Sequence, residues 1–144
     1  MPQNYQVIIE SNPKPEEIGM VVKGLSAYNA SKANGEIPNY LFITVRGEDG
    51  SIAGGVVGAT YLGWLQVQIV WVSEELRSHG YGTKLMQEAE NEAVRRGCPR
   101  VFLETLSFQA LPFYEKRGYV VFSRLVDFPP GGTRYALTKQ LNGR

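Results

Sequence analysis

One stretch decides the fold, and it reads Leu65-Gln66-Val67-Gln68-Ile69-Val70-Trp71-Val72, then Ser73-Glu74-Glu75-Leu76, then Arg77-Ser78-His79-Gly80-Tyr81-Gly82-Thr83-Lys84-Leu85-Met86. Branched and aromatic residues in its first part predict a strand. Alternation predicts that Leu65, Val67, Ile69 and Trp71 share one face, with the Trp71 side chain in the core. Two glycines then predict a tight loop, because they tolerate conformations that a Cβ would obstruct. Helix periodicity begins after Gly82.

We expect an anion-binding site where this strand and loop lead into the helix. The first N–H groups of a helix lack backbone partners, and the positive end of the helix dipole lies behind them, so a phosphate can bind there. A plain connection, with glycines serving only as turn residues, is the alternative. A P-loop is excluded because Lys and Thr are reversed and the first glycine is absent. A dinucleotide fingerprint is excluded because Leu85 stands where the third glycine belongs. The pattern that fits is Arg-x-x-Gly-x-Gly, formed by Arg77, Gly80 and Gly82.

Bulk composition narrows the class of protein. The 144 residues suit one domain, residues 1–144, with 43% apolar and 20% charged residues. Fifteen basic and fourteen acidic residues give a net charge of +1, which argues against a nucleic-acid binder. No apolar run is long enough for a membrane span, and the N-terminus lacks signal-peptide features. The single cysteine, Cys98, excludes an internal disulfide, and together with the two preceding observations this predicts a cytoplasmic location. One Cys and one His exclude a Cys/His zinc site, so we expect no metal.

Periodicity and turn signals predict the remaining elements. A helix after Pro15 should carry one apolar face, and a second helix over 82–96 should bury Leu85, Ala89 and Ala93 with its acidic residues on the other faces. A third helix should begin near Phe108, capped by Ser107, and end near Arg117. Strands are expected over 5–9, 40–46, 52–64, 65–72, 100–106, 119–128 and 133–141. The order predicts an α/β (α+β) fold with a mixed, mostly antiparallel sheet of about seven strands and helices on both faces.

A second segment carries its own signature. It reads Ser107-Phe108-Gln109-Ala110-Leu111-Pro112-Phe113-Tyr114-Glu115-Lys116-Arg117-Gly118-Tyr119. Together with Arg77-x-x-Gly-x-Gly, in this order and with a helix and a strand between them, it resembles the two signatures of the GNAT (GCN5-related) N-acetyltransferase superfamily. The resemblance covers the whole chain in architecture and roughly residues 65–122 in specific residues.

The resemblance implies an acetyl-CoA site. The strand that ends at Val70, Trp71 and Val72 would offer backbone groups to the pantetheine arm, because in this family it splays from its neighbour at 101–106. The pyrophosphate would lie in the loop formed by Arg77, Ser78, His79, Gly80, Tyr81, Gly82 and Thr83. Ser107 and Phe113, in the second signature, are also expected to contact the cofactor.

The resemblance also implies catalytic roles. Tyr114 would be the general acid that protonates the leaving thiolate, which suits a phenol beside the sulfur. The base is open: Glu104, acting directly or through water, is the candidate, and Glu74 and Glu75 are rivals. Two residues depart from the family pattern, since Ser78 stands where glycine is usual and Ser107 where asparagine is usual.

Each candidate also has an ordinary structural interpretation. Tyr114 could be a core residue with its hydroxyl at the rim, and Glu104 could be a solvated strand residue. His79 is expected to be a loop spacer or a weak phosphate contact.

We therefore predict an acetyl-CoA-dependent N-acetyltransferase that acts on a primary amine of a small molecule or peptide by direct transfer in a ternary complex. A non-catalytic acyl-CoA sensor and a purely structural GNAT-like scaffold are the alternatives. Neither nucleic acid nor membrane is an expected partner, and an exposed edge strand near 133–141 makes a homodimer plausible.

Overall fold

The computed structural model describes residues 3–141. The chain forms two compact units, and the boundary between them along the sequence lies between residues 37 and 38. In the first unit, α1 (Pro15–Lys32) begins with a proline in its first turn, followed by two glutamates, as its sequence predicts. Its large apolar residues, among them Ile18, Val22 and Leu25, are exposed.

The strand expected over residues 5–9 is wrong. The segment has no strand assignment, and Val7 and Ile9 are fully exposed. Its residues have high β propensity, but a strand needs a partner to complete its hydrogen bonds, and residues 3–37 contain no second strand.

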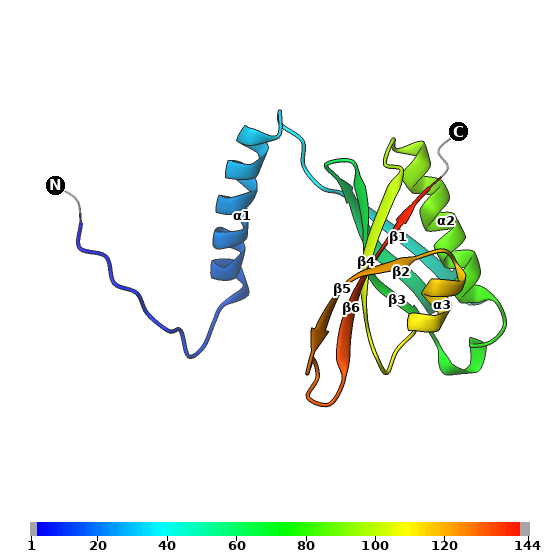
Figure 1. The fold of residues 1–144 in the computed structure, drawn as a ribbon. Coiled ribbons are helices and arrows are strands. Elements are labelled where there is room, and N and C mark those ends of the chain that lie inside the picture. Colours follow the sequence, from blue (N-terminus) through cyan, green and yellow to red (C-terminus); the bar gives the residue numbers. More distant parts are fainter. Residues whose placement is uncertain (1–2, 142–144) are drawn as a thin grey trace. The chain divides into compact units, whose positions relative to one another are not determined.

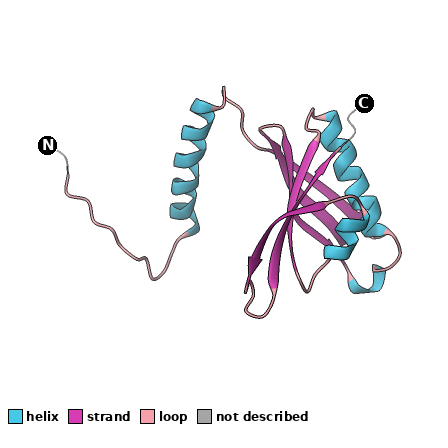
Figure 2. Cartoon of the chain, in the orientation of Figure 1, coloured by secondary structure: helices cyan, strands magenta, loops and turns pink. Residues whose placement is uncertain are grey.

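The second unit is a sheet of six strands rather than seven (Figures 1 and 2). The strands are β1 (Asn39–Arg46), β2 (Ile52–Tyr61), β3 (Trp64–Val72), β4 (Arg100–Leu106), β5 (Val120–Val126) and β6 (Thr133–Gln140). Their order across the sheet is β1-β2-β3-β4-β6-β5. The β3–β4 pair is parallel and the four other pairs are antiparallel, which confirms the mixed, mostly antiparallel sheet.

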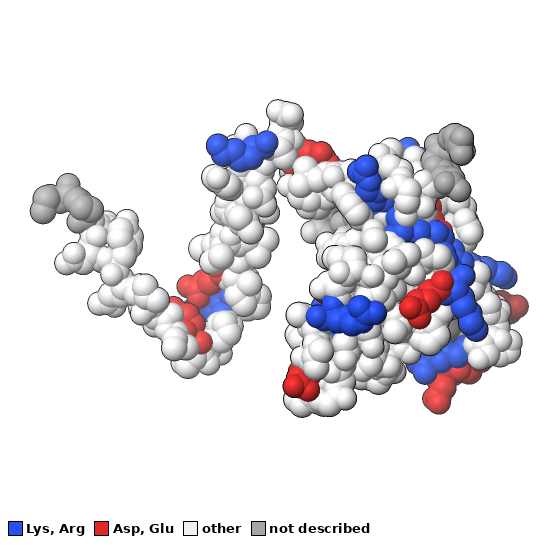
Figure 3. All heavy atoms as spheres, viewed as in Figure 1, with Lys and Arg blue, Asp and Glu red and all other residues white. Residues whose placement is uncertain are grey.

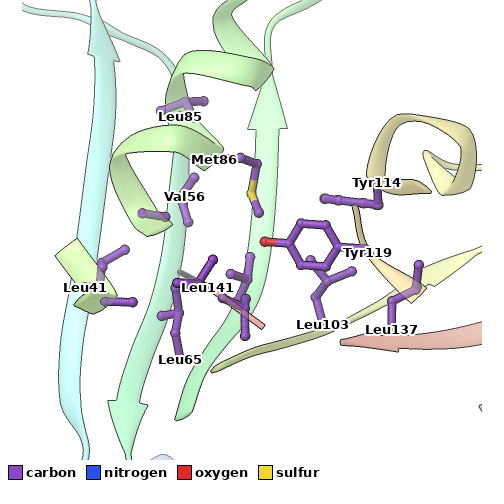
Figure 4. Packing of buried hydrophobic residues seen from close by; sticks show 14 of the residues in the cluster. Leu41, Val56, Leu65, Leu85, Met86, Leu103, Tyr114, Tyr119, Leu137 and Leu141 are labelled. Atoms are coloured by element: carbon purple, nitrogen blue, oxygen red, sulfur yellow. The ribbon is translucent and has the colours of Figure 1, made fainter. Parts of the chain in front are cut away.

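Both helices of this unit pack on the same face of the sheet (Figure 1). They are α2 (Tyr81–Arg95) and α3 (Leu111–Lys116), and a 3-10 turn (Glu74–Leu76) precedes α2. Leu85, Met86 and Ala89 of α2 are buried against strand residues such as Val56 and form one apolar cluster (Figure 4). A helix on the opposite face stays a prediction.

One residue of α2 departs from the prediction. Glu90, expected on a solvated face, is 5% exposed. Its carboxylate accepts hydrogen bonds from the Tyr119 hydroxyl at 2.7 Å, from Lys139 Nζ at 3.1 Å and from Arg117 at 3.2 Å. The ionised carboxylate loses its water on burial, and the two cations and the phenol replace the hydrogen bonds that the water made.

The charges of this unit are mixed in sign. On the face in view in Figure 3, Lys and Arg side chains are interrupted by Asp and Glu. Within residues 3–141, no helix is both long enough and apolar enough to cross a bilayer.

Candidate active site

A β-bulge at Gln68 organises the site. Val57 pairs with Ile69 but the next residue, Gly58, pairs with Val67, so Gln68 is an extra residue in β3. A bulge reverses which residues face the core. Val70 and Val72 therefore pack against the core, while Ile69 is 57% and Trp71 48% exposed. The prediction that Ile69 and Trp71 share the core face with Leu65 and Val67 is wrong for this reason.

The two central strands part beyond the bulge. The parallel ladder runs from Trp64 opposite Arg100 to Val67 opposite Leu103, and then stops, although β3 continues to Val72 and β4 to Leu106. A cavity of about 1050 Å³ opens at this point. The splayed strand pair that the family resemblance implies is thus present in the fold.

Most of the predicted cofactor residues line this cavity. They are Val70, Trp71, Val72, Arg77, Ser78, Gly80, Tyr81, Gly82, Thr83 and Phe113, and both proposed catalytic residues, Tyr114 and Glu104, line it as well. His79 and Ser107 are not among the lining residues. Residues separated by more than 40 positions in sequence are therefore gathered around one opening.

The loop before α2 presents helix N–H groups to the cavity. Gly80 is the N-terminal capping residue, with φ of +84°, and no side chain caps the helix. The first-turn N–H groups of Tyr81, Gly82 and Thr83 have no preceding turn to bond to, and these residues line the cavity. Arg77 Nε donates to the Val72 carbonyl at 3.0 Å, which holds the loop against the end of β3 and leaves the other guanidinium donors available. This arrangement suits an anionic ligand.

Ser78 and His79 shape the loop. Ser78, where the family usually has glycine, adopts φ of +65°, a left-handed conformation that costs a residue with a Cβ about 1–2 kcal/mol. His79 Nδ1 lies 2.9 Å from the Arg77 carbonyl, and because a carbonyl only accepts, the proton is on Nδ1. Gly82 lies against the Phe113 ring, where an added Cβ would be 3.5 Å from the nearest ring carbon.

Tyr114 reaches the cavity from the helix face of the sheet. It is 7% exposed, and its ring packs edge-on against Phe113 and Tyr119, with centroid distances of 5.2 and 5.7 Å. Burial raises the pKa of the Tyr114 phenol above its ordinary value. The hydroxyl is therefore protonated at neutral pH and can donate a proton or a hydrogen bond.

Glu104 reaches the same cavity from the opposite face. Its neighbours Leu103 and Thr105 are buried on the helix side, so alternation places Glu104 on the face of the sheet opposite α2 and α3. Its carboxylate accepts a hydrogen bond from the Arg134 guanidinium at 2.6 Å. This contact lowers the pKa of Glu104 below its ordinary value. The rivals Glu74 and Glu75 do not line the cavity.

Ser107 has a role other than the predicted helix cap. The helix begins at Leu111, later than expected, and its capping residue is Ala110. Ser107 Oγ instead accepts the Thr133 N–H at 3.1 Å, and the Ser107 N–H donates to the Thr133 carbonyl at 2.8 Å. Ser107 thus ties the end of β4 to the start of β6.

Sequence reasoning missed two residues that shape the site or hold one of its side chains, Gln109 and Arg134. Gln109 Oε1 accepts the Leu106 N–H at 2.8 Å and so shapes the loop after β4. Arg134 partners Glu104 from a strand that begins 29 residues later in the chain. One sequence signal for the bulge was available, which is the glycine at position 58 within a strand. The structure explains this glycine: an added Cβ would lie 2.5 Å from the Gln66 carbonyl oxygen.

A cleft between splayed parallel strands, with a helix N-terminus at one end and a buried tyrosine beside it, defines a class of protein. The sequence profile of the acetyltransferase (GNAT) family matches residues 4–119. The chain therefore belongs to the GNAT family of acetyltransferases and is an enzyme of that class.

Named relatives agree with this assignment. The chain is 40% identical to an acetyltransferase of Agrobacterium fabrum over 107 residues, which cover 74% of this chain and 78% of that one. It is 41% identical to the blasticidin-S acetyltransferase of Streptomyces morookaense over 96 residues, 66% of this chain and 71% of that one. Its fold matches a crystal structure from Agrobacterium tumefaciens with a TM-score of 0.87 and 33% identity, covering 95% of this chain and all of that one.

Proposed function

We propose that the protein transfers the acetyl group of acetyl-CoA to a primary amine of a small molecule, by direct attack in a ternary complex. The observation that carries the proposal is the single cavity that reaches both the uncapped N-terminus of α2 and the Tyr114 side chain. One end of it suits a pyrophosphate and the other supplies the proton that a departing thiolate needs.

Different residues of the site would bind different parts of acetyl-CoA. The N–H groups of Tyr81, Gly82 and Thr83, with the Arg77 guanidinium, would hold the pyrophosphate. The backbone of Val70 and Val72, which lacks a ladder partner on the β4 side, would pair with the amides of the pantetheine arm. The bound thioester supplies the electrophilic carbonyl carbon.

Two protein groups carry the two proton transfers that the reaction needs. The neutral amine forms a bond to the carbonyl carbon, and the carbon–sulfur bond breaks as the intermediate collapses. The thiolate takes a proton from the Tyr114 hydroxyl. The amine nitrogen loses a proton toward Glu104, through water, and Arg134 keeps that carboxylate ionised to receive it.

The relatives indicate the chemical class of the acetyl acceptor but do not identify the molecule. One relative is a blasticidin-S acetyltransferase, which supports a small-molecule amine rather than a peptide for this chain. A cytoplasmic location and possible homodimerisation are part of the same proposal.

Two measurements test the function. Acetyl-CoA is added in a thermal shift assay, and thiol release is then followed with a panel of amines and peptides. We expect a higher melting temperature with acetyl-CoA, and thiol release that depends on an amine. No thermal shift would contradict the cofactor assignment, and a shift without release from any amine would favour a non-catalytic acyl-CoA sensor.

A further inference from the structure

Two exposed aromatic residues line the cavity. The bulge in β3 turns Trp71 away from the core, and Trp71 is 48% exposed. Phe108, in the loop after β4, is 70% exposed and lines the same cavity. Trp71 lies in β3 and Phe108 follows the end of β4, so the two residues come from the two chain segments between which the cavity opens.

The charge at this opening is balanced. Glu104 is the one carboxylate among the described residues that line the cavity, and it is paired with Arg134. The Arg134 guanidinium in turn lies over the Phe128 ring, 4.8 Å from its centroid. An acceptor with several ammonium groups needs several unpaired carboxylates to replace its hydration, and this lining offers none.

We propose that Trp71 and Phe108 form an acceptor subsite that selects a monoamine carried on a flat aromatic group over polycationic amines. This inference rests on the proposed acetyltransferase function. The acceptor ring packs against the two side chains, as aromatic pairs do, and its single amine is directed toward Glu104. A tryptophan face also attracts a nearby ammonium before the amine loses its proton.

A binding experiment tests the subsite without turnover. The chain has two tryptophans, and Trp64 does not line this cavity, so the Trp64→Phe variant reports on Trp71 alone. Its fluorescence is titrated with 2-phenylethylamine, with 2-cyclohexylethylamine as a saturated control and with spermidine as a polycation. We expect a saturable change with 2-phenylethylamine at a concentration at least tenfold lower than with spermidine. No change with 2-phenylethylamine, or tighter binding of spermidine, would overturn the subsite.

A kinetic experiment separates this inference from the proposed function. Trp71→Leu and Phe108→Leu are expected to lower kcat/KM for 2-phenylethylamine at least tenfold while the KM for acetyl-CoA changes less than twofold. The matched control Trp64→Leu should keep both values within twofold. Unchanged kcat/KM in both variants, or wild-type turnover faster with spermidine, would overturn the subsite and leave the acetyltransferase function standing. A fluorescence change with 2-phenylethylamine but no thiol release from any amine would support the subsite and contradict the acetyltransferase function.

Discussion

Tyr114 is the residue on which the chemistry depends most. Its hydroxyl is protonated at neutral pH, since burial of the side chain raises the pKa of the phenol further above its ordinary value. We expect Tyr114→Phe, which keeps the ring packing, to lower kcat by about 100-fold or more, the range typical of a lost general acid. The affinity for acetyl-CoA, measured by calorimetry on the same sample, should be unchanged. Wild-type turnover in this variant would remove Tyr114 from the acid role.

Glu104 and Arg134 make a pH-dependent pair. Arg134 lowers the pKa of Glu104, so the carboxylate stays ionised as pH falls through the usual carboxylate range and is lost as a proton acceptor only below it. In Arg134→Gln the pKa of Glu104 rises toward its ordinary value. The acidic limb of the kcat/KM profile, measured with one amine for both proteins, should therefore move to higher pH.

A matched arginine provides the control for this pair. Arg124 is exposed and lies over the Tyr135 ring rather than beside Glu104. Arg124→Gln should leave the acidic limb where it is in the wild type. Superimposable limbs in all three proteins would mean that Glu104 does not accept the amine proton.

Ser78 stores backbone strain in the loop that precedes α2. Its φ of +65° costs about 1–2 kcal/mol for a residue with a Cβ, whereas glycine at the same position loses about 0.5–1 kcal/mol of chain entropy on folding. Ser78→Gly should thus raise the free energy of unfolding by roughly 0.5–1 kcal/mol. Urea denaturation measures this change. A lower stability would show that the serine side chain makes a compensating contact.

At the scale of elements, the bulge in β3 requires its neighbour in β2 to be small. In Gly58→Ala the new Cβ would lie 2.5 Å from the Gln66 carbonyl oxygen, so the two strands must shift. We expect a loss of about 1–3 kcal/mol of stability, typical of overpacking, together with weaker acetyl-CoA binding because the splay is displaced. Thermal denaturation and a CoA titration check both effects.

Gly24 supplies the comparison for this substitution. It lies within α1, and an added Cβ would meet nothing within 4 Å. Gly24→Ala should be neutral or stabilise by about 0.5–1 kcal/mol through helix propensity. Equal behaviour of the two alanine variants would contradict the steric argument at Gly58.

The same element marks how far the sequence could predict the structure. The strands at residues 40–46 and 100–106 and the helix after Gly82 follow from local periodicity and were predicted closely. The bulge was missed because Leu65, Val67, Ile69 and Trp71 alternate as well as any regular strand. The face that Trp71 occupies depends on the register with β2, which local sequence does not specify.

The site was predictable where motifs are local. The Arg77–Gly82 loop and Tyr114 lie in contiguous signatures, and both reach the cavity. Arg134, Gln109 and the burial of Glu90 were missed because their partners come from other elements. A charged residue at the edge of the apolar face of a helix is predicted to be exposed to solvent until those partners are known.

At the scale of the whole unit, Glu90 connects α2 with the segments before β5 and within β6. Removing a buried carboxylate from between two partly buried cations leaves their charges uncompensated, and breaking a buried pair in this way typically costs about 3–5 kcal/mol. We expect this loss for Glu90→Ala, measured by urea unfolding. Glu88→Ala, on an exposed position of the same helix, should change stability by less than about 0.5 kcal/mol.

The parallel pair at the centre of the sheet has a mechanical consequence. The strands β1, β2 and β3 form one antiparallel half, and β4, β6 and β5 form another, and only four residue pairs join the halves. The sheet therefore has a seam, already open over half its length. A substrate can enter along this seam without breaking rungs in either half, and amide groups that bond to it from both edges would serve as the missing rungs. Hydrogen exchange at residues 68–72 and 104–106 should consequently slow when acetyl-CoA binds, while the outer strands keep their rates.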